Sequence, residues 1–115
     1  MKTNFKFGEV NKFNEAIGYN AEMVEFKTVF ETEQGGVSLV AMKKGQKLET
    51  HTAPFEVMVN VCEGEIEFTM LDTPNTIKAG EFFLMGANVA HSVLAKEDSK
   101  LMLVKVKDKP HNTNI

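Results

Sequence analysis

Arginine is absent from this chain, so lysine accounts for all 13 of its basic residues. Nucleic-acid recognition relies on the planar guanidinium group, which reads base edges and phosphates with paired donors. The lysines are spread along the chain and the formal net charge is −3, so we expect no nucleic-acid partner. The three that alternate near the C-terminus, Lys105, Lys107 and Lys109, are interpreted as the solvated side of an ending strand.

Cysteine and long apolar runs are also scarce. Cys62 is the single cysteine and cannot form an internal disulfide, which favours a reducing compartment. No segment approaches the ~20 apolar residues of a membrane span, and residues 1–6 have no apolar run typical of a signal peptide. We therefore expect a cytoplasmic protein with no membrane partner.

The chain that remains has the composition of one ordinary globular domain. Its 115 residues are 43% hydrophobic and 25% charged, enough for a single core. Helical periodicity is confined to residues 13–17, whereas short β-prone segments separated by turn residues fill most of the rest. The pattern predicts an all-β barrel or sandwich over about residues 20–107. Residues 1–19 then form an N-terminal arm and residues 108–115 a polar tail, within one domain spanning 1–115.

Turn residues suggest how these strands connect. Glu63-Gly64 has the composition of a hairpin turn, and the segment Asp72-Thr73-Pro74-Asn75 is predicted to be another turn. Alternation before the first turn places Cys62 on the opposite strand face from Val61, outside the barrel interior. The cysteine is therefore not predicted to be a nucleophile.

Two histidines stand out because each ends a similar segment. Gly45 leads through five residues to His51, and Gly80 begins a second stretch that reaches His91. A histidine in an apolar strand is unusual unless a site needs a ligand or a proton carrier. One such histidine would be read as a satisfied barrel residue, whereas two in matching segments favour a shared pocket.

These segments resemble the two sequence motifs of small single-domain cupins, of the RmlC-like, cupin-2 type. Gly45 and His51 match the start of the first motif and Gly64 matches its end, while Gly80 and His91 match the second. The resemblance implies a jelly-roll barrel, the cupin double-stranded β-helix, with a metal or substrate site inside. It also implies a homodimer paired through its sheets, and the apolar outer positions of the strand that carries Cys62 are consistent with that.

The chain departs from the cupin pattern where metal ligands are expected. Ala53 occupies the second histidine position and Val57 the glutamate position, so His51 and His91 alone remain of the implied metal ligands. Glu56 is one residue away from the carboxylate position, which turns its side chain to the other strand face unless a bulge intervenes. The metals compatible with two imidazoles and a third ligand are divalent Zn, Ni, Fe, Mn or Cu.

Three functions are compatible with this sequence. The favoured one is a cupin that binds an unidentified small molecule without a tightly held metal; its reaction, if it is an enzyme, is open. The alternatives are a metal-dependent oxygenase, isomerase or lyase, and a non-catalytic structural or regulatory dimer. The residues predicted to form the ligand pocket are His51, His91, Ala53, Val57, Val59, Phe83 and Met85.

Overall fold

The computed structural model describes residues 1–107, so the predicted tail at 108–115 lies outside the described residues. Within residues 1–107 there are ten strands and one short helix, and no helix has the length and hydropathy that crossing a membrane requires. In chain order the elements are β1 (Lys2–Thr3), α1 (Phe13–Ala16), β2 (Glu25–Thr32), β3 (Gly35–Met42), β4 (Lys47–His51), β5 (Glu56–Glu63), β6 (Glu65–Met70), β7 (Thr73–Lys78), β8 (Phe82–Met85), β9 (His91–Ala95) and β10 (Ser99–Val106).

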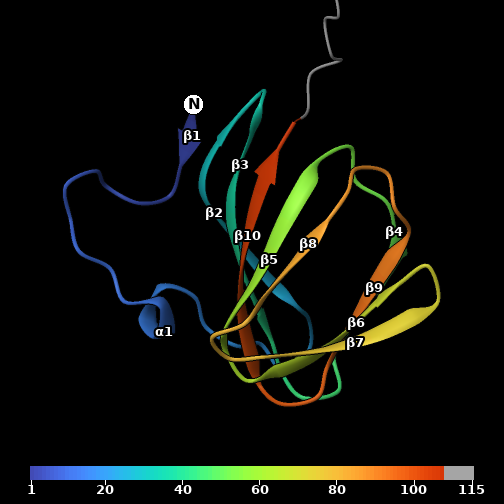
Figure 1. The fold of residues 1–115 in the computed structure, drawn as a ribbon. Helices are drawn as coiled ribbons and strands as arrows, with labels where there is room; N and C mark the ends of the chain where they lie inside the picture. The colour runs from blue at the N-terminus through green and yellow to red at the C-terminus, as the bar shows by residue number, and fades with distance from the viewer. Residues whose placement is uncertain (108–115) are drawn as a thin grey trace, which may run out of the picture.

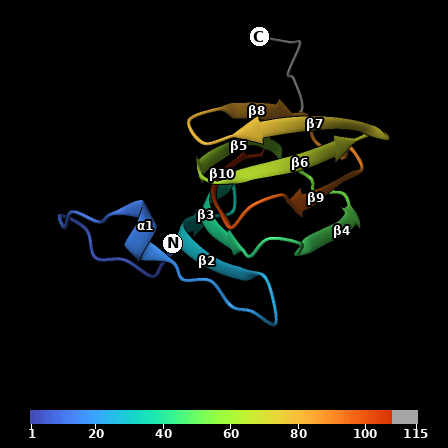
Figure 2. The ribbon, with the colours of Figure 1, turned by 90° about the horizontal axis from the view of Figure 1, so that it is seen from below.

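The strands form two antiparallel sheets that face each other. The larger sheet has the order β1-β2-β3-β10-β5-β8, and the smaller one has the order β4-β9-β6-β7. Figure 1 shows the larger sheet in the middle of the molecule with the smaller sheet beside it, and Figure 2 shows the two sheets from below. The prediction of an all-β fold is confirmed.

The core fills the space between the sheets, and strand alternation explains how. In β5, Val57, Val59 and Val61 are buried. Met58 and Cys62 belong to the alternate positions of the strand and are partly exposed on the outer face. Fully burying a valine contributes about 1.5–3 kcal/mol, so one face of this strand strongly favours the interior. Cys62 lies outside the barrel interior as predicted, and burial, followed by the charge of Glu63, raises the pKa of its thiol.

The N-terminal arm covers part of the outer face of the larger sheet. Ile17 is buried against Leu39 and Ala41, forming a second, smaller hydrophobic cluster. The Tyr19 hydroxyl donates a hydrogen bond to the Glu63 carboxylate, which ties the arm to the end of β5. Earlier in the chain, β1 pairs with β2, and the arm then makes a wide excursion away from the barrel before α1 (Figures 1 and 2).

Two of the predicted turns are corrected by the topology. Gly64 does not form a hairpin, because β5 belongs to the larger sheet and β6 to the smaller one; it is the corner at which the chain passes between them. The turn predicted at residues 72–75 is shorter: Leu71 and Asp72 have positive φ and connect β6 directly to β7, which contains Pro74. Proline is tolerated there because β7 is an edge strand.

Candidate functional site

The two histidines come from neighbouring strands of the smaller sheet. His51 ends β4 and His91 begins β9, and the antiparallel register pairs the two residues directly. Their ring centroids are 4.2 Å apart, with the ring planes inclined at 57°. The pairing of β4 with β9 shifts in register between Leu48 and His51, so His51 lies opposite His91. The matching glycine-led segments therefore bring both imidazoles to one place.

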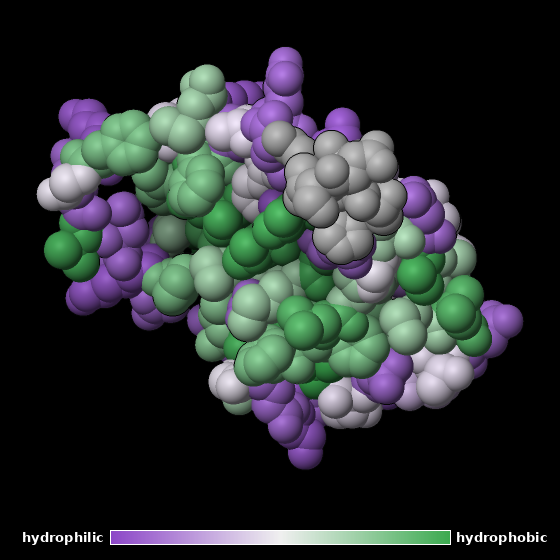
Figure 3. All heavy atoms as spheres, turned by 45° about the horizontal axis from the view of Figure 1, so that its top comes forward, coloured by the Kyte–Doolittle hydropathy of each residue, from purple (hydrophilic) through white to green (hydrophobic). Residues whose placement is uncertain are grey.

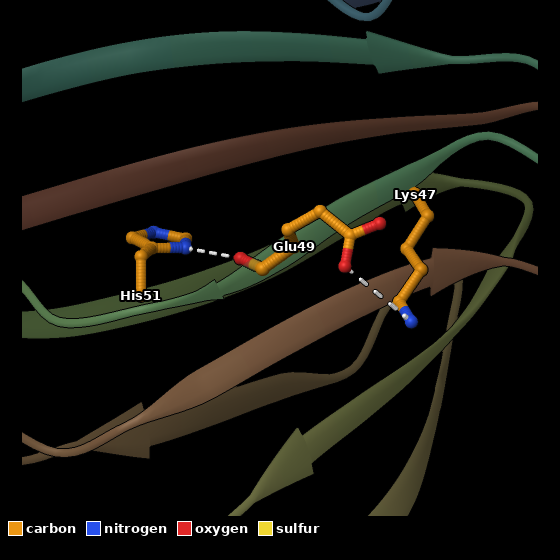
Figure 4. Close-up of polar contacts among 3 residues, drawn as sticks. All are labelled: Lys47, Glu49 and His51. Carbon is orange, nitrogen blue, oxygen red and sulfur yellow. Dashed lines mark hydrogen bonds and ion pairs between the residues drawn. The ribbon is translucent and has the colours of Figure 1, made fainter.

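Hydrogen bonds to the backbone fix the orientation of both rings. The Nδ1 atom of His51 lies 2.8 Å from the Glu49 carbonyl oxygen, and Nδ1 of His91 lies 2.8 Å from that of Val89. Figure 4 shows the first of these contacts, beside the ion pair of Lys47 and Glu49. Since a carbonyl oxygen only accepts, each Nδ1 carries a hydrogen and donates it. In the neutral rings, each Nε2 is left with a free lone pair.

His91 is the more buried of the two histidines. It is 7% exposed, and its ring stacks on that of Phe68 at a centroid distance of 5.4 Å and an interplanar angle of 11°. Burial lowers the pKa of the His91 imidazole, and the nearby His51 lowers it further, while the hydrogen bond to Val89 opposes both effects. His91 is therefore a neutral proton acceptor near pH 7.

This lowered pKa predicts a pH dependence of stability. When the pH falls below about 6.5, the ordinary value for histidine, the unfolded chain binds a proton at His91 that the folded chain does not. Stability is therefore expected to decrease as the pH falls from 7.5 toward the folded-state pKa. In a His91→Gln variant this part of the decrease should disappear. Urea unfolding at pH 7.5 and 5.5 measures it, and an identical pH dependence in both proteins would contradict the prediction.

A cavity of about 130 Å³ adjoins both imidazoles in the barrel interior. Of the predicted pocket residues, those that line it are His51, His91, Ala53, Val57, Val59 and Met85. Phe83 does not line it; its ring is next to that of Phe68, at a centroid distance of 5.2 Å. The lining residues that the sequence interpretation missed are Phe26, Leu48, Phe68, Val93, Leu101, Leu103 and Lys105. Most of them continue the inward alternation of β9 and β10, which the sequence pattern already contained.

Lys105 corrects one interpretation made from the sequence. The alternating lysines were expected on a solvated strand face, but Lys105 shares the inward face of β10 with Leu101 and Leu103 and lines the cavity. Lys107 is exposed just after β10, and Lys109 lies outside the described residues. Alternation over two lysines could not show which strand face was inward.

The side chains present do not fit a three-ligand metal centre. The free Nε2 atoms of His51 and His91 are suitable donors, but a catalytic site in proteins usually adds a third protein ligand. Glu56 was the predicted candidate for that ligand; its carboxylate instead accepts a hydrogen bond of 3.0 Å from the backbone N–H of Ala87. Among residues 1–107, no three histidine, cysteine or carboxylate side chains are grouped as metal ligands would be.

Comparison of the sequence with protein-family models gives one family for this chain. The cupin domain model matches residues 38–107, more than half of the chain. The chain belongs to the cupin family. This part of the cupin contains both histidines, the Gly64 corner and every strand from the middle of β3 to β10.

Solved structures of other proteins show the same fold. A conserved protein of unknown function from Streptococcus pyogenes is 22% identical, with a TM-score of 0.87 over 96% of this chain and 98% of that one. An RmlC-like cupin from Desulfovibrio desulfuricans is 24% identical, with a TM-score of 0.77 over 86% and 96%.

A cupin-2 conserved barrel domain protein from Leptotrichia buccalis is 27% identical, with a TM-score of 0.78. That match covers 82% of this chain but 46% of the other, so the chain spans less than half of that protein. No curated protein matches.

Proposed function

We propose that this cupin binds a small, mostly apolar organic molecule and orients its polar group with His51 and His91, without a tightly held metal. The observation that carries the proposal is the pair of Nε2 atoms at the cavity. Within the described residues neither has a hydrogen-bond partner, and both rings are otherwise surrounded mainly by apolar side chains. An acceptor in such surroundings interacts favourably with a donor that a ligand supplies.

The alternatives have less support. A metal-dependent enzyme requires a third ligand, and the best candidate, Glu56, is bonded to Ala87. A purely structural dimer would have no need of a cavity beside both histidines. Metal content separates the first alternative from the proposal: mass spectrometry of protein purified without chelator should find far less than one metal per chain. Near-stoichiometric metal that is lost in a His51→Ala variant would overturn the proposal.

Ligand binding itself is tested by thermal shift with a library of small organic compounds. A ligand present at 100 times its dissociation constant stabilises the folded state by about 2.7 kcal/mol, which a melting curve detects easily. We expect compounds that stabilise the parent protein and have no effect on a His51→Ala, His91→Ala double variant. The matched control is Thr50→Ala with Ser92→Ala, since these residues neighbour the histidines without lining the cavity. Unchanged binding in the histidine variant would contradict the proposal.

We also propose that the outer face of the larger sheet pairs with a second copy of the chain. Phe82 and Leu84 are 60% and 67% exposed on the edge strand β8, beside the partly exposed Met58. An apolar groove of about 490 Å³ lies between the arm and the same sheet, and Phe7 and Phe13 line its arm side.

Figure 3 shows a face of the molecule on which hydrophobic side chains gather in a broad, hollowed band. A two-fold dimer needs projecting and receiving surfaces on the same face. The outer face of the larger sheet has the projecting side chains of β8 and the groove beside the arm. Light scattering should give twice the chain mass, and Leu84→Glu should reduce it to the chain mass.

A further inference from the structure

One charged side chain lines the cavity. Lys105 is the only lysine, arginine, aspartate or glutamate among the described residues that surround it. It also borders a neighbouring surface hollow together with Glu31, yet the two side chains form no ion pair. The Lys105 ammonium is therefore a cation with three donors that no carboxylate of the described residues neutralises.

Lys105 and the histidines lie on opposite walls of the barrel. Lys105 belongs to β10 of the larger sheet, where it pairs with Val57 of β5, whereas His51 and His91 belong to the smaller sheet. The side chains of Val57 and Met85 line the same cavity. A molecule in the cavity consequently meets Lys105 from one sheet, His51 and His91 from the other and apolar side chains between them.

These two polar walls require different groups of a ligand. An ammonium group recognises an anion, and a carboxylate forms charge-assisted hydrogen bonds with it. Each Nε2 atom of His51 and His91 presents a lone pair where Nδ1 carries the hydrogen, and a lone pair would repel a carboxylate and accept a hydrogen from a hydroxyl group. A plain fatty acid satisfies Lys105 alone, and an alcohol satisfies the histidines alone.

We propose that the cavity binds a small hydroxy acid, whose carboxylate contacts Lys105 and whose hydroxyl donates to Nε2 of His51 or His91. This inference rests on the proposed function and names the chemical class of its ligand. The volume limits the carbon skeleton, since an apolar cavity of about 150 Å³ in another protein holds one benzene molecule. A skeleton of about four to six carbons therefore suits a cavity of about 130 Å³, with the carboxylate at its edge.

Matched probes test the two anchors separately. Calorimetric titrations would use 4-hydroxybutanoate, 5-hydroxypentanoate and 6-hydroxyhexanoate, and for each length the plain carboxylate and the terminal diol. For at least one length, the hydroxy acid should bind the parent protein about tenfold more tightly than either matched probe, because a hydrogen bond to a charged group and one to an imidazole acceptor each contribute at about that scale. This comparison needs no variant and so cannot be confounded by misfolding.

Variants then assign each anchor to its residue. Lys105→Met should lower the affinity for the hydroxy acid to that for the diol, and the double histidine variant should lower it to that for the plain acid. Lys44→Met is the control, because Lys44 is exposed and does not line the cavity. Equal binding of hydroxy acid and diol, or no effect of Lys105→Met, would overturn the inference while leaving a histidine-dependent ligand site intact. Absence of binding by all probes would also overturn the inference. The proposed function would then be tested separately, by the thermal-shift screen of the compound library.

Discussion

Replacing Gly64 by alanine is expected to reduce the stability of the folded cupin by about 2–5 kcal/mol, through a left-handed backbone that alanine resists and a clash that it creates. Gly64 has φ of +85°, and an added Cβ would lie 2.3 Å from both the Asp98 carbonyl oxygen and Ser99 Oγ. Neither atom can move easily. The first belongs to the backbone, and Ser99 Oγ accepts a hydrogen bond from the backbone N–H of Glu65. The loss is large beside the ~5–15 kcal/mol that stabilises a typical domain.

Gly80 provides a matched control for the contribution of the clash. Its φ is +88°, almost that of Gly64, but no atom lies within 4 Å of a Cβ built on it. Gly80→Ala should therefore cost only the backbone strain, about 1–2 kcal/mol. Urea unfolding of the two variants and the parent separates the effects. If both variants lost the same stability, the crowded corner between the sheets would not be the reason for glycine at position 64.

The fold was predictable because local patterns and barrel topology agree. Alternation in β5 and the glycine-led histidine segments identified an all-β cupin barrel without any long-range information. The connection at Gly64 was not predictable in this way, since a positive-φ glycine suits a hairpin and a corner between sheets equally well. Which sheet a strand joins depends on pairings between residues distant in the chain, and no local pattern contains these.

The candidate site could be predicted only in part, for a related reason. Spacing identified His51 and His91, but the sequence could not show that both rings donate Nδ1 hydrogens to backbone carbonyls and leave Nε2 free. Lys105 was assigned to the wrong strand face, because a charged side chain near the end of a strand usually faces solvent. Phe83 was placed at the cavity, whereas the neighbouring Phe68 lines it and Phe83 does not.

Phe68→Ala is expected to have the largest effect on both stability and site. The Phe68 side chain is 2% exposed and is next to the rings of both His91 and Phe83. Truncating a buried phenylalanine typically costs about 3–5 kcal/mol, because the lost burial is combined with an unfilled cavity. Phe7→Ala removes the same phenyl group from the arm, where it is 75% exposed, and should change monomer stability by less than about 0.5 kcal/mol. Urea unfolding at low protein concentration compares the two.

The same substitution tests whether burial against Phe68 causes the lowered pKa of His91. Phe68 covers one face of the His91 ring, and burial is the main cause of the lowered pKa of that imidazole. Opening the space behind the ring should admit water or a small aromatic molecule, so the pKa of His91 should rise toward its ordinary value in Phe68→Ala. A titration of the histidine ring signals by NMR, in the parent and the variant, measures this directly. An unchanged His91 pKa would show that residues other than Phe68 keep the ring neutral.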